Sequence, residues 1–513
     1  MTTYSAVVTT GIYCRPGCSA KPLAKNTRTF ELAAAAEAAG FRACLRCRPY
    51  RVAGPVGSDA PELVCQAVQM IIDGALDDGA EAALAARVGL SSRHLRRLFL
   101  KHLGASPDQL ARSRRAHFAR RLLDDTDLTV LDIAFASGFG SLRQFNRTMR
   151  QVFRASPTEL RNRRHRADRL VADGGLALRL PILPGYDWDA VRSFLAVRAM
   201  PGVEAIEGDT YRRTITMEGA PGVLEISPGG AGHLLLRAHL PYWEGLIHVV
   251  DRVGRLLGID TDHAAGVAAL SADAVLGTMV RNRPGLAVPG AWSPFEIGVQ
   301  AILSRGRATR PVAHWLQAIV TSLGTPVPGL PEGLTHTFPD AAVVTSTSLT
   351  AIGLPSTDAT AIATLAATAA EGHTALRSGT TLDALAALPG IDQDLRHHLA
   401  FRLGQREAFP LTDPSLDAAL ADLGVHPSST TPHPAPWSQR WRPWLALAAV
   451  HLMTHGDTLL RQTELGFPAD QRVEDPAVPQ LSEGNTSPRT GTVVVSRRRP
   501  CGGRAVGMAD WYA

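Results

Sequence analysis

The sequence predicts a multidomain, mainly α-helical protein. A small zinc-binding α/β domain and a double helix-turn-helix domain are expected first, followed by an α+β domain and an all-α domain. Three observations favour this fold class. Four cysteines stand in two close pairs near the N-terminus, a basic helical block follows them, and a strand-rich segment then gives way to a long helical region. With 513 residues, the chain is long enough for three or four domains that each bury a core.

Composition limits the class of partner. No apolar run approaches the roughly 18–20 residues of a membrane span. The N-terminus lacks the charged and apolar pattern of a secretion signal, so we expect a cytoplasmic protein. Residues 87–166 contain 18 Arg and Lys against six Asp and Glu, a local net charge of +12, whereas the whole chain has +6. Basicity concentrated in one block indicates a nucleic-acid partner.

The cysteine spacing predicts a metal site. Cys14 and Cys18 form C-x3-C, and Cys44 and Cys47 form C-x2-C after 25 intervening residues. Two such pairs reach adjacent corners of one tetrahedral site, so we expect one Zn²⁺ bound by all four cysteines. The zinc either holds a small domain together or keeps a thiolate that can accept an alkyl group. Spacing by itself favours the structural interpretation.

The residues around these cysteines add a chemical expectation. TTGIYCRPGC, followed by GFRACLRCRP, resembles the N-terminal methyl-acceptor domain of Ada-type adaptive-response proteins, here over residues 1–55. The resemblance implies that Cys14 takes a methyl group from a DNA phosphotriester and that the other three cysteines complete its zinc site. Methylation would remove one negative charge from the cluster and so raise DNA affinity. Ala43 stands where the family has Pro, and fewer residues than usual precede the motif.

The basic block has helical spacing over residues 60–166. Segments 84–104 and 132–154 share one layout, with a small-residue helix, a turn at Gly89 or Gly138, a Ser and a longer polar helix. With the closing FRASPTELR they resemble the AraC-type DNA-binding domain, which has two helix-turn-helix motifs on one linker helix. The expected DNA-binding residues are Arg93, His94, Arg96 and Arg97 in the first motif, and Ser141, Arg143, Gln144, Asn146 and Arg147 in the second.

The remaining chain has strand and turn patterns over residues 176–285 and helical patterns over 286–460. PGAWSPFE, ALPGI, AFPLTD and WRPW resemble the AlkA-type DNA-3-methyladenine glycosylases II, which have an N-terminal α/β domain and a helix-hairpin-helix domain. The chain therefore resembles an Ada-type regulator fused to a glycosylase. The resemblance implies a base pocket with Trp292, Trp441 and Trp444. Residues 461–513 are expected to be a disordered tail.

The chemistry of such a site requires one carboxylate. An alkylated purine is already cationic, so the protein must supply a pocket for the flipped base and an anion beside the developing oxocarbenium ion. Asp413, in AFPLTD, falls where the family places its catalytic Asp. Taken alone, an Asp before Pro is more often a helix N-cap or turn residue. No Lys follows Lys101, which excludes Schiff-base chemistry by a lysine and predicts a monofunctional enzyme.

Several DNA-contacting positions depart from the glycosylase pattern. The hairpin LPGIDQDLR keeps Gly390 but has Asp392 where a Gly is expected for positive φ or close approach to a phosphate. Asp394 and Met453 replace aromatic residues. Residues 304–307, which match the segment that inserts a wedge into the DNA in this family, contain Arg305 and Arg307, and these could contact phosphates. Together these changes predict weakened DNA engagement.

We therefore expect a nucleoid-associated alkylation-response protein. It would excise bases such as 3-methyladenine, sense methylphosphotriesters at a zinc-bound Cys and regulate transcription. Its partners would be double-stranded DNA, as alkylated DNA and as promoter sites, and RNA polymerase. No membrane partner is expected. One alternative is a transcription regulator with a degenerate, inactive glycosylase half. Another is a constitutive repair enzyme whose helix-turn-helix only adds DNA affinity.

Overall fold

The structure is a computed structural model that describes residues 3–15, 18, 23–51, 60–77, 79–164, 169–170, 175–305, 307, 309–371, 382–425 and 436–466. The predicted tail lies outside the described residues from 467 onwards. In the described ranges, no helix is long and apolar enough to cross a membrane.

The N-terminal cysteine-rich domain is a small α/β fold. Its four-stranded sheet has the order β3-β1-β2-β4, in which β1 pairs antiparallel with β2 and β3, and β2 pairs parallel with β4. The strands are β1 Tyr4–Val7, β2 Ile12–Cys14, β3 Thr27–Phe30 and β4 Arg42–Ala43, with helix α1 at Ala33–Ala38 and 3-10 turns at Ala24–Asn26 and Pro49–Arg51. Apolar Tyr4, Ala6 and Tyr13 are buried in its core. The predicted small α/β domain is confirmed.

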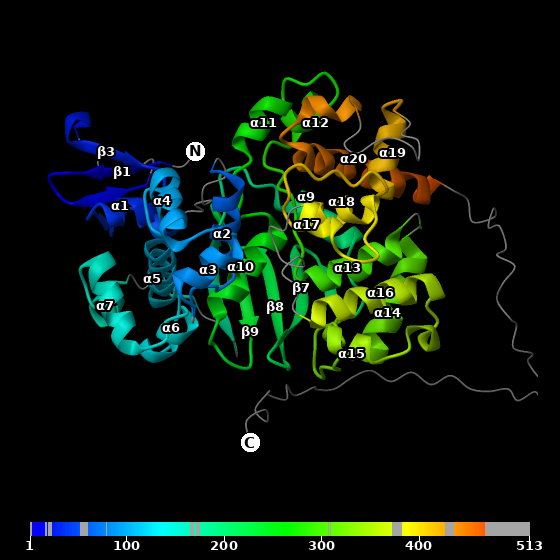
Figure 1. The fold of residues 1–513 in the computed structure, drawn as a ribbon, viewed down its shortest axis with the longest axis horizontal. Coiled ribbons are helices and arrows are strands. Elements are labelled where there is room, and N and C mark those ends of the chain that lie inside the picture. The colour runs from blue at the N-terminus through cyan, green and yellow to red at the C-terminus, as the bar shows by residue number, and fades with distance from the viewer. Residues whose placement is uncertain are drawn as a thin grey trace, which may run out of the picture. The chain divides into compact units, whose positions relative to one another are not determined.

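The basic block forms seven helices within its described residues (Figure 1). They are α2 Glu62–Ile72, α3 Glu81–Arg87, α4 Ser92–Leu103, α5 Pro107–Asp125, α6 Val130–Ala136, α7 Leu142–Phe153 and α8 Pro157–Asn162. The turns after α3 and α6 contain Gly89 and Gly138 at φ +70° and +76°, a region that favours glycine. Pairs α3–α4 and α6–α7 are thus two helix-turn-helix motifs joined by α5, as predicted.

The next domain contains a five-stranded antiparallel sheet of order β5-β9-β8-β7-β6. The strands are β5 Leu176–Pro181, β6 Glu204–Glu207, β7 Thr210–Met217, β8 Ala220–Pro228 and β9 His233–His239, and the helices are α9 Trp188–Val197 and α10 Leu246–Leu257. The strands and turns of this domain agree with the strand and turn patterns predicted over residues 176–285.

A helical domain completes the described chain. Its elements are α11 Ala264–Leu270, α12 Gly277–Asn282, α13 Pro294–Ser304, α14 Thr309–Leu323, α15 Ala341–Thr345, η4 Leu349–Ile352, α16 Ser356–Ala370, α17 Leu382–Ala386, α18 Gln393–Arg402, α19 Pro414–Asp422, η5 Pro436–Trp441 and α20 Leu445–Gly466. Helix α13 packs against α14, α16 and α18 with an apolar surface that includes Ile297, Val299 and Ile302. Helix α20 continues to Gly466, beyond the end predicted at residue 460.

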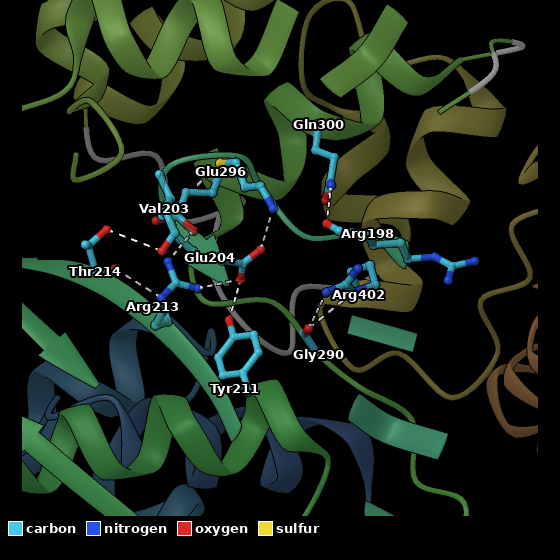
Figure 2. Close-up of polar contacts among 12 residues, drawn as sticks. Arg198, Val203, Glu204, Tyr211, Arg213, Thr214, Gly290, Glu296, Gln300 and Arg402 are labelled. Atoms are coloured by element: carbon cyan, nitrogen blue, oxygen red, sulfur yellow. Dashed lines mark hydrogen bonds and ion pairs between the residues drawn. The ribbon is translucent and has the colours of Figure 1, made fainter. Parts of the chain in front are cut away.

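A buried ion-pair cluster joins the sheet to the helical domain (Figure 2). Arg213 of β7 is 1% exposed and pairs with Glu204 at 3.2 Å and with Glu296 of α13 at 2.9 Å. The hydroxyl of Tyr211 donates to Glu204. Because buried charges require partners, this cluster fixes α13 against β7.

Candidate metal centre, DNA-binding helices and Asp413 cavity

The four predicted metal ligands come together. Their Sγ atoms all lie within 4.8 Å of one another. The parallel pairing of β2 and β4 explains this, because the carboxyl ends of parallel strands meet at one edge and the backbone N–H of Cys44 bonds to the carbonyl of Tyr13 at 2.9 Å. Cys14 ends β2 and Cys44 follows β4, while Cys18 and Cys47 lie four and three residues further along the chain.

The four cysteine thiols are suited to binding a divalent cation. Burial, followed by the neighbouring Cys44, raises the pKa of Cys14 well above its usual range, and burial raises that of Cys47 to about 12. Burial also disfavours the Cys44 thiolate, but N–H groups of Cys47 and Arg46 outweigh it and lower that pKa. A zinc ion supplies the positive charge that four adjacent thiolates need. The cluster is therefore a four-cysteine zinc site.

Two polar contacts connect the zinc domain to helix α5. Beside the ligand Cys14, the hydroxyl of Tyr13 donates to Glu37 at 2.7 Å, and Glu37 lies 2.6 Å from Nε2 of His117. Beyond the last cysteine, the hydroxyl of Tyr50 donates to Asp124 at 3.0 Å. Both segments that carry metal ligands thus contact the helix that links the two helix-turn-helix motifs.

The first predicted recognition helix is α4. Arg93, Arg96 and Arg97 are exposed on it, His94 is half-buried, and Leu95 lies on the buried face. Arg96 pairs with Glu81 of α3 at 3.2 Å, which ties α4 to the preceding helix. The exposed arginines place positive charge where a phosphate or base edge can meet it.

The second predicted recognition helix is α7. Arg143 and Arg147 are exposed, and Gln144 and Asn146 are half-buried. Ser141 precedes the helix as its N-cap, since its side chain accepts from the backbone N–H of Gln144 at 3.2 Å. The hydroxyl therefore has a local structural role at the start of α7.

Asp413 lies on the wall of a cavity of about 500 Å³ in the helical domain. The end of α9 and helices α13, α14, α18, α19 and α20 contribute to the lining. Asp413 is 6% exposed and is the N-cap of α19, because its Oδ1 accepts from the N–H of Ser415 at 3.0 Å. The N-cap role and the cavity position therefore belong to the same carboxylate.

Arg198 lies between Asp413 and a second carboxylate, Asp457 of α20. Its guanidinium is 3.4 Å from Oδ1 of Asp413 and 2.8 Å from Oδ2 of Asp457. Burial opposes the charge on Arg198, but the two carboxylates outweigh it and raise the pKa of the guanidinium. Gln300 of α13 donates to the carbonyl of Arg198 at 2.7 Å (Figure 2).

Two residues of α18 complete the electrostatic surroundings. Burial lowers the pKa of His398 to about 4, so this imidazole is neutral at neutral pH. Burial also lowers the pKa of Arg402 to about 10, which leaves it charged. Arg402 donates to the carbonyl of Gly290 at 2.7 and 3.2 Å, as Figure 2 shows.

The hairpin before α18 differs from the sequence expectation. Asp392 has φ −76°, so this position does not need positive φ, and the left-handed residue is Gly390 at φ +76°. Close approach of this position to a phosphate, the other expected reason for a Gly, stays a prediction. Asp392 caps α18 through the N–H of Leu395 and pairs with Arg305 at 2.9 Å. Arg307 pairs with Asp358 at 2.9 Å.

The three predicted pocket tryptophans lie elsewhere. None is among the described residues that line the Asp413 cavity. Trp292 is buried under Arg213, Trp441 is 2% exposed and packs near Phe409, and Trp444 lines a separate cavity of about 140 Å³. Trp292 and Trp441 are buried in the core, where large rings remove much surface from water, whereas Trp444 is half-buried. Their role in a base pocket stays a prediction.

Sequence reasoning missed three residues around Asp413, namely Arg198, Ser415 and Asp457. Arg198 ends the apolar run FLAV, and Asp457 follows a long apolar stretch in α20. An isolated charge beside an apolar helix face is a signal for a buried partner, but it does not identify which partner.

The fold and these sites define a class of protein with a zinc–cysteine domain, a double helix-turn-helix and a cavity whose wall contains the carboxylates of Asp413 and Asp457. Family models match the metal binding domain of Ada at residues 2–50, a helix-turn-helix domain at 84–163 and the AlkA N-terminal domain at 177–293.

Curated relatives extend these matches over most of the chain. The probable bifunctional transcriptional activator/DNA repair enzyme AlkA of Mycobacterium tuberculosis is 36% identical over 460 residues, covering 88% of this chain and 92% of the relative. This chain belongs to that family. DNA-3-methyladenine glycosylase 2 of Escherichia coli is 28% identical over 52% of this chain and 94% of its own. The bifunctional transcriptional activator/DNA repair enzyme Ada of Escherichia coli is 32% identical over 28% of this chain and 41% of its own.

Proposed function

We propose that this protein removes alkylated bases such as 3-methyladenine from DNA and regulates transcription in response to DNA methylation damage. Family membership supports both activities. The observation that carries the repair activity is Asp413, a buried carboxylate on the wall of a cavity of about 500 Å³. We propose domain boundaries at 1–55, 60–166, 176–285 and 286–460.

The reaction needs little from the protein beyond binding and an anion. A flipped, cationic purine leaves with the electron pair of its N-glycosidic bond, and the sugar becomes an oxocarbenium ion. Water then adds to the anomeric carbon and loses a proton. Within the described chain, Oδ1 of Asp413 is engaged by Ser415 and Arg198, whereas Oδ2 has no hydrogen-bond partner. Oδ2 is therefore the oxygen that faces the developing charge in this proposal.

The test is release of 3-methyladenine from methylated duplex DNA by wild type and by Asp413→Asn. Asn is also a good N-cap, so α19 should keep its start while the charge is lost. We expect base release to fall by about 100-fold or more, with DNA binding retained. Asp417→Asn, one turn later and exposed, is the matched control and should behave as wild type.

A regulator with an inactive repair half is the second candidate. It is favoured by the absence of any Phe, Tyr or Trp among the described residues that line the Asp413 cavity, because base pockets commonly stack bases on such rings. A folded wild type that binds DNA but releases no methylated base would establish this candidate and exclude the repair activity.

For the sensor, we propose that Cys14 accepts a methyl group from a DNA methylphosphotriester. The S–C bond forms while the C–O bond breaks, and the electron pair stays on the phosphate oxygen of the resulting diester. Zinc bound by the four cysteines would keep the acceptor sulfur deprotonated. Cys14 is 7% exposed, and Cys18 and Cys47 are more exposed, so accessibility makes them the rival acceptors.

Peptide mass spectrometry after incubation with methylated DNA tests this assignment. One added methyl on Cys14 is the expected result. A methyl on Cys18 or Cys47 would reassign the acceptor, and no modification would exclude the sensor. We also propose that the protein binds promoter DNA through α4 and α7 and contacts RNA polymerase. Arg143→Ala should then weaken promoter affinity about fivefold or more.

A further inference from the structure

Arg198 is held much more closely by Asp457 than by Asp413. Its two terminal nitrogens lie 2.8 and 3.3 Å from the two carboxylate oxygens of Asp457, which is a bidentate pair. Its contact with Asp413 is one nitrogen at 3.4 Å. Because a bidentate arrangement is the stronger geometry for Arg and a carboxylate, Asp457 determines where the guanidinium lies.

Ser415 connects the two carboxylates. Its hydroxyl donates to Oδ1 of Asp457 and accepts from Arg198 at 3.1 Å, while its backbone N–H bonds to Asp413 at 3.0 Å. Asp457 is 3% exposed and Ser415 is 4% exposed. The orientation of Arg198 is therefore set by a buried, hydrogen-bonded group that includes the first turn of α19.

The charge balance of the cavity wall depends on Asp457. Arg198 is a half-buried cation and Arg402 a buried one, and Asp413 and Asp457 are the carboxylates among the described lining residues. His398 is neutral at neutral pH because burial lowers its pKa to about 4. The other charged groups on the lining are Arg305, Arg307 and Arg461. Loss of Asp457 would leave Asp413 as the single carboxylate facing a cationic wall.

We propose that Asp457 is a positioning residue for base excision, which engages Arg198 and thereby leaves the charge of Asp413 available to the cationic sugar. This inference rests on the proposed glycosylase activity. Without Asp457, the guanidinium can move the short distance to Asp413 and pair with both of its oxygens. Asp413 would then be neutralised by its own neighbour at the moment when its charge is needed.

Asp457→Asn is the first test, because it removes the charge and keeps the size. The maximal rate of 3-methyladenine release should fall by about tenfold to 100-fold, with KM nearly unchanged. The acid limb of the rate–pH profile should also move to lower pH, because a closer guanidinium favours the ionised carboxylate. A merely structural role for Asp457 predicts lower thermal stability without this shift. Asp457→Glu keeps the charge and should recover most of the rate.

The double variant Arg198→Gln with Asp457→Asn gives an independent readout. Removing both members of the pair eliminates the excess cation, so the double variant should be faster than Asp457→Asn. A duplex with a cationic pyrrolidine in place of one deoxyribose, compared with its neutral tetrahydrofuran analogue, reports the charge of the site without catalysis. The preference for the cationic duplex should fall in Asp457→Asn and return in the double variant.

The outcomes separate this inference from the proposed function. A wild type that neither releases base nor prefers the cationic duplex contradicts the glycosylase activity. If wild type releases base and prefers the cationic duplex, and Asp457→Asn has the same rate and pH profile as wild type, only the role of Asp457 is contradicted. A crystal structure of Asp457→Asn gives the answer without any activity: we expect two Arg198–Asp413 hydrogen bonds, and an unmoved guanidinium would overturn the inference.

Discussion

Arg305 and Asp392 form an ion pair, with 2.9 Å between Nη1 of the arginine and Oδ2 of the aspartate. The same carboxylate caps α18 by accepting from Leu395. An Asp at this hairpin position is therefore compatible with the backbone. Its unfavourable effect on DNA binding is electrostatic, because its carboxylate repels phosphates. Both side chains are substantially exposed, at 42% and 51%, so the pair adds little stability and a DNA phosphate can compete for Arg305.

Asp392→Asn should strengthen DNA binding. Asn keeps the N-cap, while loss of the carboxylate removes repulsion from phosphates and releases Arg305 to contact them. We expect Kd for an abasic-site duplex to fall several-fold. The slope of log K against log salt concentration should steepen by about one, as for one additional phosphate contact. Fluorescence anisotropy at several salt concentrations measures both quantities.

The control for this prediction is Arg305→Gln in both backgrounds. If pairing with Asp392 keeps Arg305 from contacting DNA, loss of Arg305 should remove most of the increase in DNA affinity that Asp392→Asn produces. Equal affinity of Asp392→Asn and wild type at every salt concentration would show that this hairpin does not approach the DNA backbone.

Local motifs were predictable from sequence because their partners lie close together in the chain. Two cysteine pairs and a parallel pairing of short strands produce the metal cluster, and Gly89 and Gly138 mark turns that the backbone requires. The recognition helices follow from apolar spacing within each helix. The residues of each cysteine pair and of each turn lie within a few positions of one another, and only the joining of the two pairs spans 25 residues.

Long-range partners were not predictable in the same way. Arg198 and Asp457 are 259 residues apart in sequence, and each is a single charge beside an apolar helix. The resemblance implies a base pocket with Trp292 and Trp441, but sequence does not show that both rings are buried away from the described lining of the Asp413 cavity. For Asp413, sequence posed an N-cap and a catalytic carboxylate as alternatives, whereas one side chain in the structure caps α19 and lines the cavity.

Loss of one zinc ligand should remove the metal and unfold the cysteine-rich sheet locally. Cys44→Ala leaves three ligands at the junction of β2 and β4, so zinc content should fall from one per chain to near zero. Amide protection against hydrogen exchange should be lost in β2 and β4 and kept in the helical domain. Cys65→Ala, outside the cluster on α2, is the matched control and should retain zinc. Full zinc occupancy in Cys44→Ala would contradict the four-cysteine site.

The buried histidine His451 should make the protein acid-sensitive. Burial lowers its pKa from 6.5 to about 4, so between these values the unfolded chain binds a proton that the folded chain does not. Stability from this group is therefore present above pH 6.5 and is lost as pH falls toward 4. His451→Gln should lose about 2 kcal/mol less unfolding free energy than wild type between about pH 7.5 and pH 5. Urea unfolding at the two pH values measures this difference.

The matched control for acid sensitivity is His455→Gln, one turn later on the same helix. His455 is 32% exposed and contacts Asp422 on α19. This variant should keep the acid sensitivity of wild type. Identical pH dependence in His451→Gln and wild type would show that the buried imidazole does not account for the loss of stability.

Arg213→Met should be strongly destabilising, because it leaves the half-buried carboxylates of Glu204 and Glu296 without the buried cation between them. Breaking a buried ion pair in this way costs about 3–5 kcal/mol, whereas the pairs of half-buried Arg212 with exposed Glu207 and half-buried Glu225 should cost less than about 1 kcal/mol. Arg212→Met, from the adjacent position of β7, is therefore the matched control. Unfolding in urea at neutral pH compares the two variants directly.

The pH dependence of Arg213→Met distinguishes lost charge pairing from lost packing. Burial raises the pKa of Glu296 and Arg213 opposes this, so removal of Arg213 makes the folded state bind protons more readily. A carboxyl whose folded pKa lies above its unfolded value gains stability as pH falls, and the deficit of the variant should shrink from about pH 7 toward about pH 5. A deficit that stays constant over this range would indicate packing. Since Glu296 and Gln300 lie one turn apart on α13, and Gln300 holds the carbonyl of Arg198, the same variant should also slow base release.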